Sequence, residues 1–278
     1  MNKAEKTAII LSGGGARSAH GGGFLYAMAK ELGITAPHIM IGSSGDSGNV
    51  LYYSAGQYEE IKRIFEEHLC SKKFLSSWRV WRMMDVDYLV DTIFKQLEPL
   101  NTESVRTTPI QWLIPITDYV SGEIQYASAA DTIDPFEILR ASEALPFYYG
   151  KRVSLLGHTY IDGELGPTLQ DHIRKACQLG ATRILFINHC GPWVGFKRAA
   201  METYALFCSQ GLRDAIMRDI RTDTAQLEFP NGKLLVVNPI ELPVLSIEND
   251  KQKLIATFEN GYHNALALKE ELRTLFDV

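Results

Sequence analysis

The sequence predicts an α/β fold with three layers, α/β/α, and a mostly parallel central sheet. Two observations support this prediction. Short apolar runs suited to buried strands alternate with longer segments whose apolar residues recur at helical spacing. No internal repeat, linker or low-complexity stretch interrupts the alternation. The 278 residues, 46% hydrophobic and 22% charged, are therefore interpreted as one domain spanning 1–278.

The first predicted strand, at 7–11, leads into a glycine-rich turn, Ser12-Gly13-Gly14-Gly15-Ala16-Arg17, before a helix at 21–32. Three glycines allow backbone N–H groups to converge on one point, and the dipole of the following helix adds positive charge there. Such a cluster suits an oxyanion hole, the set of donors that meets the negative oxygen of an acyl-transfer intermediate. A nucleotide site is the rival, but Gly-x-Gly-x-x-Gly fails at Ser18 and no Gly-Lys-Ser/Thr ending is present.

The second predicted strand, at 39–41, is followed by Gly42-Ser43-Ser44-Gly45-Asp46 and a helix that continues over 50–57. A strand, a sharp turn and a helix form the frame of a nucleophile elbow, in which the Ser of Gly-x-Ser-x-Gly stands exposed at the top of a sheet. Four of the five positions fit, because Asp46 occupies the last one. An ordinary strand-to-helix turn rich in small residues is the alternative.

A helix is predicted at 59–69, and the character of the sequence then changes over about 71–100, which is interpreted as a helical, cap-like insertion. Between Lys72 and Met84, basic residues without an acid alternate with aromatic ones, Trp78 and Trp81 among them, and a helix follows at 87–97. One interpretation of this pattern is a cap over the site or a patch in peripheral contact with a membrane surface. An ordinary helical cover with a solvated basic side is the alternative.

The remaining elements continue the alternation. Strands at 110–117 and 123–128 form a predicted hairpin, in which Pro115 indicates an edge or a bulge. Asp134-Pro135 opens a helix as an N-cap and N1 proline do. The later elements are a second hairpin at 153–161 that ends at Asp162, a helix at 167–179, a strand at 183–188, one long helix through 201–216, a strand at 234–237 and a final helix through 254–272.

The pair Asp162-Gly163 after a short strand is, by itself, typical of an ordinary turn. Together with Gly-Gly-Gly-x-Arg after the first strand and Gly-x-Ser after the second, it resembles the patatin-like phospholipases. Ala141-Ser142-x-Ala144-x-Pro146 and Asn49 are also similar to that family. The resemblance runs from about residue 6 to the helix that follows the Asp-Gly pair, and more faintly to the C-terminus.

The resemblance implies a serine acyl-hydrolase that acts on phospholipid or other fatty-acyl esters and needs no cofactor or metal. Ser44 would be the nucleophile and Asp162 the base that takes its proton. An Asp with the usual pKa of about 3.9 is a poor base near neutrality, so we expect partial burial to raise it. A triad through a histidine is the alternative, with His158, His172 and His189 as the candidates nearest to the Asp in sequence.

The other motif residues take supporting roles under the same resemblance. Backbone N–H groups of Gly14, Gly15 and Ala16 would hold the oxyanion, while Arg17 would anchor their loop without touching the substrate. The small residues that support these motifs are Gly13, Gly42 and Gly163.

Two residues depart from the family pattern, since Ser18 and Asp46 stand where glycine is usual. A carboxylate about 7 Å from the oxyanion would oppose it by roughly 2 kcal/mol, or about thirtyfold in rate. Asp46 could instead lie favourably in the first turn of its helix or pair with a cation such as Arg17. The alternative function is therefore a catalytically weak or inactive patatin-like protein that binds a lipid or a protein partner.

Composition narrows the setting. The net charge of −5 offers no general attraction for nucleic acid. The N-terminus resembles no signal peptide and no run approaches transmembrane length, which favours a cytoplasmic protein, peripheral at membranes. Four cysteines lie far apart, fit no metal spacing and are expected to be reduced thiols.

Overall fold

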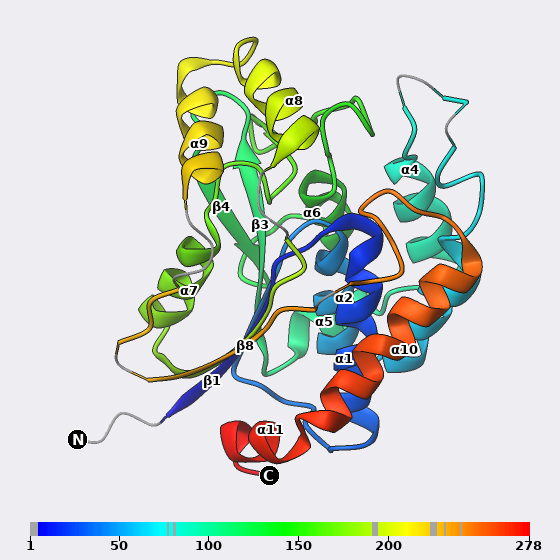
Figure 1. Cartoon of the computed structure of the whole chain (residues 1–278), viewed down its shortest axis with the longest axis vertical. Helices are drawn as coiled ribbons and strands as arrows, with labels where there is room; N and C mark the ends of the chain where they lie inside the picture. Colours follow the sequence, from blue (N-terminus) through cyan, green and yellow to red (C-terminus); the bar gives the residue numbers. More distant parts are fainter. Residues whose placement is uncertain are drawn as a thin grey trace.

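The computed structural model describes residues 5–76, 78–79, 82–190, 194–222, 227–230, 232–239 and 241–278. Trp81, one of the residues predicted to contact membranes, lies outside these ranges. A central sheet runs through the molecule with helices packed on both of its faces (Figure 1). The C-terminus lies at the end of the molecule opposite helix α8 (Gly195–Ala205) (Figure 1).

The sheet comprises eight strands within the described residues, in the order β5-β6-β3-β2-β1-β7-β8, with β4 also paired to β3. Strands β1, β2, β3, β7 and β8 pair in parallel, whereas β4 and β6 run antiparallel to β3, and β5 runs antiparallel to β6. This arrangement confirms the predicted α/β class with a mostly parallel sheet. The strands are β1 (Lys6–Leu11), β2 (Ile39–Gly42), β3 (Gln111–Asp118), β4 (Ile124–Ser128), β5 (Val153–Leu155), β6 (His158–Ile161), β7 (Ala181–Ile187) and β8 (Lys233–Val237).

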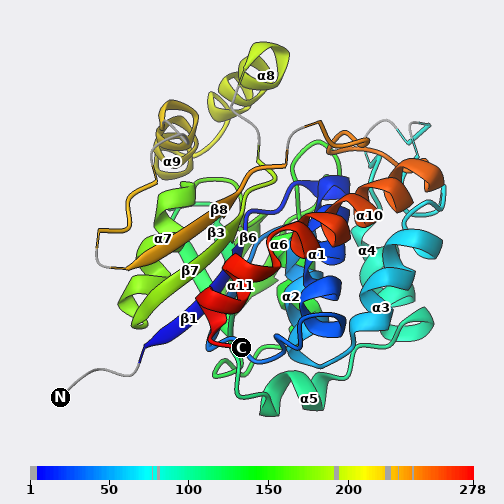
Figure 2. The same ribbon diagram turned by 60° about the horizontal axis from the view of Figure 1, so that its bottom comes forward.

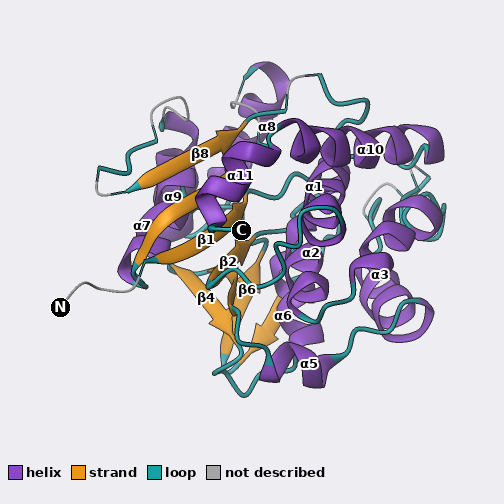
Figure 3. Ribbon diagram, turned by 90° about the horizontal axis from the view of Figure 1, so that it is seen from below, coloured by secondary structure: helices purple, strands orange, loops and turns teal. Residues whose placement is uncertain are grey.

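Alternate residues of the strands face two different helical layers, as the two-residue period of a strand requires. In β1, Ile9 and Leu11 join the core beneath α1 (Ser18–Lys30), α2 (Gly45–Ser54) and α10 (Lys251–Ala267). Ala8 and Ile10 face the opposite way, into a second core with α7 (Leu169–Gln178). Figure 3 shows the sheet between these two layers. A buried apolar run in the sequence thus becomes a strand covered on both faces.

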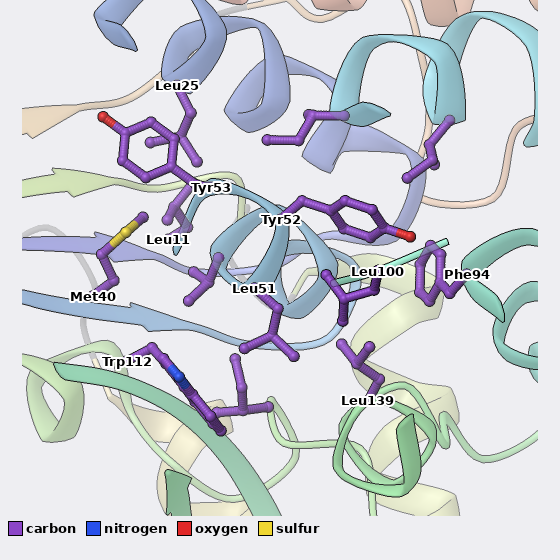
Figure 4. Close-up of a cluster of buried hydrophobic side chains, with 14 of the residues drawn as sticks. Leu11, Leu25, Met40, Leu51, Tyr52, Tyr53, Phe94, Leu100, Trp112 and Leu139 are labelled. Atoms are coloured by element: carbon purple, nitrogen blue, oxygen red, sulfur yellow. The ribbon is translucent and has the colours of Figure 1, made fainter. Parts of the chain in front are cut away.

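The larger core is built around α2, from which Leu51, Tyr52 and Tyr53 project in different directions (Figure 4). Tyr52 packs against Phe94 with ring centroids 5.6 Å apart. The remaining helical elements are η1 (Gly15–Arg17), α3 (Tyr58–Arg63), η2 (Ile64–His68), α4 (Val86–Tyr88), η3 (Leu89–Leu97), α5 (Thr102–Thr107), α6 (Pro135–Ser142), α8, α9 (Gln210–Arg221) and α11 (Lys269–Phe276).

Two predicted helices are wrong in their continuity. The long helix predicted through 201–216 is two helices: α8 ends at Ala205, and α9 starts at Gln210, where Ser209 caps it by accepting a hydrogen bond from the Leu212 N–H. The final helix is likewise divided at Leu268 into α10 and α11. In both cases the apolar spacing persists across a break, so the periodicity alone could not locate it.

Pro115 lies in β3, which has partner strands on both sides. The prediction that Pro115 marks an edge strand is therefore wrong. The pairing with β2 ends at Leu113 and the pairing with β6 begins at Thr117. The Pro115 carbonyl faces this gap and accepts a hydrogen bond from the Ser142 hydroxyl. Because the N and O atoms of one strand residue point to the same side, the missing N–H of proline costs no ladder bond here.

Candidate active site

Ser44 sits at the turn between β2 and α2 with φ 48° and ψ −129°. A non-glycine residue with positive φ is uncommon and concentrates at functional sites. The turn is tight because glycines flank it: a Cβ on Gly42 would lie 2.5 Å from Val50 Cγ2, and one on Gly45 would lie 2.8 Å from the Gly15 carbonyl oxygen. This is the geometry expected of a nucleophile elbow.

The Ser44 hydroxyl donates a hydrogen bond of 2.9 Å to Asp162 Oδ2. Asp162 follows β6, and its Oδ1 accepts from the Glu164 N–H at 2.9 Å. Its side chain is fully buried, and burial raises the pKa of Asp162 to about 7, although the hydrogen bonds from Glu164 and Ser44 act in the opposite direction. Glycine at position 163 lets the backbone next to Asp162 lie close to Pro115 of β3, since a Cβ there would lie 1.9 Å from the Pro115 carbonyl oxygen.

The three histidines considered for a triad bind elsewhere. His158 Nδ1 lies 3.0 Å from Asp118, and His172 lies between the Tyr126 hydroxyl at 2.9 Å and the Ser43 hydroxyl at 3.4 Å. His189 Nδ1 lies 3.0 Å from Asp46 Oδ2. Among the described residues, none of the three contacts Ser44 Oγ or the Asp162 carboxylate by a hydrogen bond. The serine and the aspartate are therefore paired directly.

Ser142 is a part of the site to which the sequence argument assigned no role. Its hydroxyl accepts from the Ser44 N–H at 3.1 Å and donates to the Pro115 carbonyl at 2.9 Å. Ser142 thus ties the turn that carries Ser44 to β3, across the gap left between β2 and β6. The Ala-Ser-x-Ala-x-Pro motif contained the signal, but only the fold brings α6 beside the turn.

The glycine-rich loop after β1 lies against the same turn. Gly13, Gly14 and Gly15 all have positive φ, at 74°, 134° and 61°. A Cβ on Gly13 would lie 2.7 Å from the Ser43 carbonyl oxygen, so the loop and the elbow are in close contact. No described group accepts a hydrogen bond from the N–H of Gly14 or Gly15, which leaves both donors available to a ligand.

Ala16 differs from the two glycines. Its N–H donates to the Ser246 carbonyl at 2.9 Å, so the prediction that it supplies a third oxyanion donor does not fit this geometry. Arg17 was expected to anchor the loop, yet its Nε is buried without an acceptor among the described residues. The loop packs closely against Ser246, since a Cβ on Gly15 would lie 2.3 Å from the Ser246 carbonyl oxygen.

A cavity opens beside Ser44 and is lined mainly by apolar side chains. Many of them come from η2 and from the predicted insertion at 71–100, including Ile64, Phe65, Phe74, Leu75, Met84 and Phe94. The loop that contacts Ala16 closes another side with Ser246 and Ile247. A mostly apolar lining next to the Ser44 hydroxyl has the chemistry that suits an acyl chain.

Two more buried carboxyl groups surround the pair. Glu143 borders the cavity and accepts from the Ser47 hydroxyl at 3.3 Å. Burial, and secondly the charge of Asp162, raise the pKa of Glu143 to about 8. Burial likewise raises the pKa of Glu164 well above its usual range, so burial disfavours the ionised form of both groups. No group of His, Cys, Asp and Glu that could hold a metal occurs in the described part of the chain.

Comparison with known proteins identifies the family. The family model described as "Patatin-like phospholipase" matches residues 9–169, more than half of the chain. The chain belongs to the patatin-like phospholipase family. The match covers the glycine-rich loop, the elbow and the Asp-Gly pair, as the sequence motifs predicted.

Relatives of this patatin-like protein differ in length and in how closely they match. The "Uncharacterized protein YjjU" of Escherichia coli (strain K12) is 22% identical over 198 residues, which are 66% of this chain but only 52% of that protein. The chain thus spans about half the length of this curated relative.

Among solved structures, VipD from Legionella pneumophila has a TM-score of 0.56 at 13% identity, over 96% of this chain and 67% of that one. This likeness supports the shared fold. Human GIVD cytosolic phospholipase A2 also matches over 98% of this chain and 60% of that one, at 13% identity, but its TM-score of 0.38 adds no support.

The two departures from the patatin-like pattern both lie at the contact between loop and elbow. Ser18 is fully buried, and its hydroxyl has no hydrogen-bond partner among the described residues. Asp46 is also fully buried, and its carboxylate accepts from Asn49 Nδ2 at 2.7 Å in addition to its contact with His189. Asp46 thus accepts hydrogen bonds within the first turn of α2, and the ring beside it is His189 and not the Arg17 guanidinium.

Proposed function

We propose that this chain is a serine acyl-hydrolase that cleaves phospholipid or other fatty-acyl esters through a Ser44–Asp162 dyad. The observation that carries the proposal is the 2.9 Å hydrogen bond from the Ser44 hydroxyl to the buried Asp162 carboxylate, at the mouth of an apolar cavity. The family relationship supports the same class of reaction.

In the proposed reaction, Asp162 takes the proton of Ser44 as Oγ attacks the ester carbonyl carbon. The negative oxygen of the tetrahedral intermediate would accept hydrogen bonds from the N–H groups of Gly14 and Gly15. Protonated Asp162 then gives its proton to the leaving alcohol, and an acyl group remains on Ser44. A water molecule, deprotonated by Asp162, attacks this acyl-enzyme, and Asp162 returns the proton to Ser44 Oγ as the bond to the acyl group breaks and the fatty acid leaves.

The direct test is labelling by a fluorophosphonate probe together with turnover of a soluble short-chain ester. Ser44→Ala should abolish both, because it removes the nucleophile, and should lower the Tm by no more than a few degrees. Ser47→Ala, one helical turn further along α2, serves as the control and should still be labelled. Absence of labelling in the wild type would favour the alternative, a protein that binds a lipid or protein partner without cleaving it.

We also propose that the segment from Lys72 to Met84 contacts a lipid surface at the periphery of a membrane, although the structure narrows which residues are free to do so. Arg79 and Arg82 pair with Asp85, at 3.0 and 2.6 Å, and Phe74 is buried in the cavity wall. Among the residues of this segment that the structure describes, Trp78 is the large apolar side chain left exposed, at 92%. In the part of the chain that the structure describes, no helix is long and apolar enough to cross a membrane.

A further inference from the structure

A line of buried polar side chains passes behind the glycine-rich loop and takes no part in the dyad chemistry. Asp46 Oδ2 lies 3.0 Å from His189 Nδ1, and His189 Nε2 lies 3.1 Å from His20 Nδ1. His20 Nε2 then lies 2.9 Å from Asn264 Nδ2, on α10. The carboxylate and both imidazoles are buried. The line joins four elements of the fold: α2, the segment after β7, α1 and α10.

The hydrogen bonds of this line run in one direction. Asn264 Nδ2 donates to Asn260 Oδ1 at 3.2 Å and has a second hydrogen for His20 Nε2. Since Nε2 of His20 accepts, its proton is on Nδ1 and is donated to His189 Nε2. His189 therefore carries its own proton on Nδ1 and donates it to Asp46. Burial, with His189 and then Arg17 nearby, lowers the pKa of His20 to about 3, as a neutral ring requires.

The surrounding backbone is shaped to fit these groups. A Cβ on Gly21 would lie 2.4 Å from Asp46 Oδ1 and 2.9 Å from His189 Cε1. A Cβ on Gly261 would lie 1.9 Å from the His20 carbonyl oxygen, so α1 and α10 can approach closely only because glycine stands there. A buried carboxylate is costly unless it is hydrogen-bonded, and Asp46 has donors in both His189 and Asn49.

His189 also contacts the loop that offers the oxyanion donors. Its backbone N–H donates to the Ser12 hydroxyl at 2.7 Å, and a Cβ on Gly14 would lie 3.0 Å from His189 Cβ. Asp46 stands only two residues after Ser44. His189 thus contacts the glycine-rich loop through its backbone and Cβ, and it contacts α2 through its ring.

We propose that Asp46 and His189 are positioning residues that hold the glycine-rich loop at a set distance from Ser44, and that His20 fixes the tautomer in which His189 donates to Asp46. This inference rests on the proposed function, because the distance matters where the loop meets an oxyanion formed at Ser44. This line of hydrogen bonds also gives a role to Asp46, which stands where glycine is usual, because its carboxylate accepts the last hydrogen bond of the line. Losing the link would let the donors shift, which affects the transition state more than substrate binding.

Two substitutions of His189 separate this role from simple packing. The amide nitrogen of an asparagine lies near the place of Nδ1, so His189→Asn can still donate to Asp46, whereas His189→Gln reaches toward His20 instead. With a soluble short-chain ester, we expect kcat to fall by about 10²-fold in His189→Gln and by less than about threefold in His189→Asn, with KM nearly unchanged in both. His263→Gln, an exposed histidine on α10, is the matched control.

Equal losses in the two His189 variants, wild-type kcat in both, or a change confined to KM would each overturn the proposal. Asp46→Asn gives an independent check, because one oxygen becomes an NH₂ group that must face a donor, either His189 or Asn49. Its kcat should fall. A rise in kcat would instead show that the Asp46 charge opposes the oxyanion, and would overturn the positioning role.

A spectroscopic measurement tests the line without relying on turnover. In wild-type protein labelled with ¹⁵N-histidine, His20 and His189 should both carry their proton on Nδ1, and Asp46→Ala should shift the His189 signals. Protonation of both rings on Nε2 in the wild type would overturn the proposed direction and the link to Asp46. Fluorophosphonate labelling of Ser44 in the same sample reports separately on the proposed function, so failure of one is distinguishable from failure of the other.

Discussion

At the scale of single residues, the burial of Asp162 is the property that makes it suitable as a base. Only the ionised carboxylate can take the Ser44 proton, and burial raises its pKa to about 7. Activity on a soluble ester should therefore rise as the pH increases through about 7 and level off above it. Asp162→Asn keeps the shape but removes the base, so kcat should fall by about 10²- to 10⁴-fold.

A pH profile of kcat/KM from pH 5 to 9 checks this assignment. Glu143→Gln is the control, because Glu143 also has a raised pKa, at about 8, and lies beside the same cavity. If Asp162 is the base, the rise in activity keeps its midpoint near pH 7 in Glu143→Gln. A profile that loses this rise in Glu143→Gln, or that stays intact in Asp162→Asn, would contradict the role given to Asp162.

The residues of the candidate site could be predicted only as far as local motifs reach. Ser44, Gly14 and Gly15 each lie in a strand-and-turn signature, and Asp162 follows from the family motif. The contact of Ser246 with the Ala16 N–H could not be predicted, because it joins residues far apart in the sequence and Ser246 lies in no motif. The same holds for His189, whose ring finds Asp46 only in the folded chain.

At the scale of elements, strands were predicted more closely than helices. Each strand is a short apolar run bounded by turns, and β3, β4 and β7 lie within two residues of their predicted limits. Helix boundaries depend on caps such as Ser209, where a polar side chain outweighs a continuing apolar spacing. The predicted helices at 59–69 and 87–97 contain π-helical turns, η2 and η3, that apolar spacing does not distinguish from α-helix.

Side chains of the segment 71–100 line the cavity, and under the proposed function this predicts control over acyl-chain length. Met84→Trp should fill the cavity and so reduce turnover of long-chain p-nitrophenyl esters by about tenfold or more, while turnover of a four-carbon ester stays near the wild-type value. The magnitude follows because a lost methylene contact typically changes the rate by a few-fold to about 10²-fold. Met83→Trp is the matched control, since Met83 is not among the cavity-lining residues.

Comparing kcat/KM across a series of chain lengths in both variants measures the effect. A uniform loss at every length in Met84→Trp would indicate disturbance of Ser44 itself. Equal profiles in the two variants would mean that the acyl chain does not occupy this cavity.

At the scale of the whole molecule, large exposed apolar side chains gather on loops near the carboxyl ends of the parallel strands, the edge where Ser44 lies. Val120 follows β3, Phe147 follows α6, and Phe207, 82% exposed, follows α8. Trp78 and Leu245 lie on two loops beside the cavity, and α8 stands at this end of the molecule (Figure 2). Exposed apolar groups clustered at one end favour contact with another apolar phase.

This arrangement predicts that Trp78 matters for substrate presented in a bilayer and not for substrate in solution. Trp78→Ala should lower activity on phospholipid vesicles by about tenfold, since an exposed indole that inserts into an interface contributes on the order of 1–2 kcal/mol. Its activity on a soluble short-chain ester should stay near the wild-type value, because Trp78 is 92% exposed and supports no core packing.

Val278→Ala, 60% exposed at the opposite end of the molecule, provides the control and should lose neither activity (Figure 1). Vesicle flotation of the two variants measures binding without turnover. If Trp78→Ala loses equal activity on vesicles and on the soluble ester, Trp78 supports the cavity wall. If Trp78→Ala floats with vesicles as the wild type does, Trp78 does not contact the lipid.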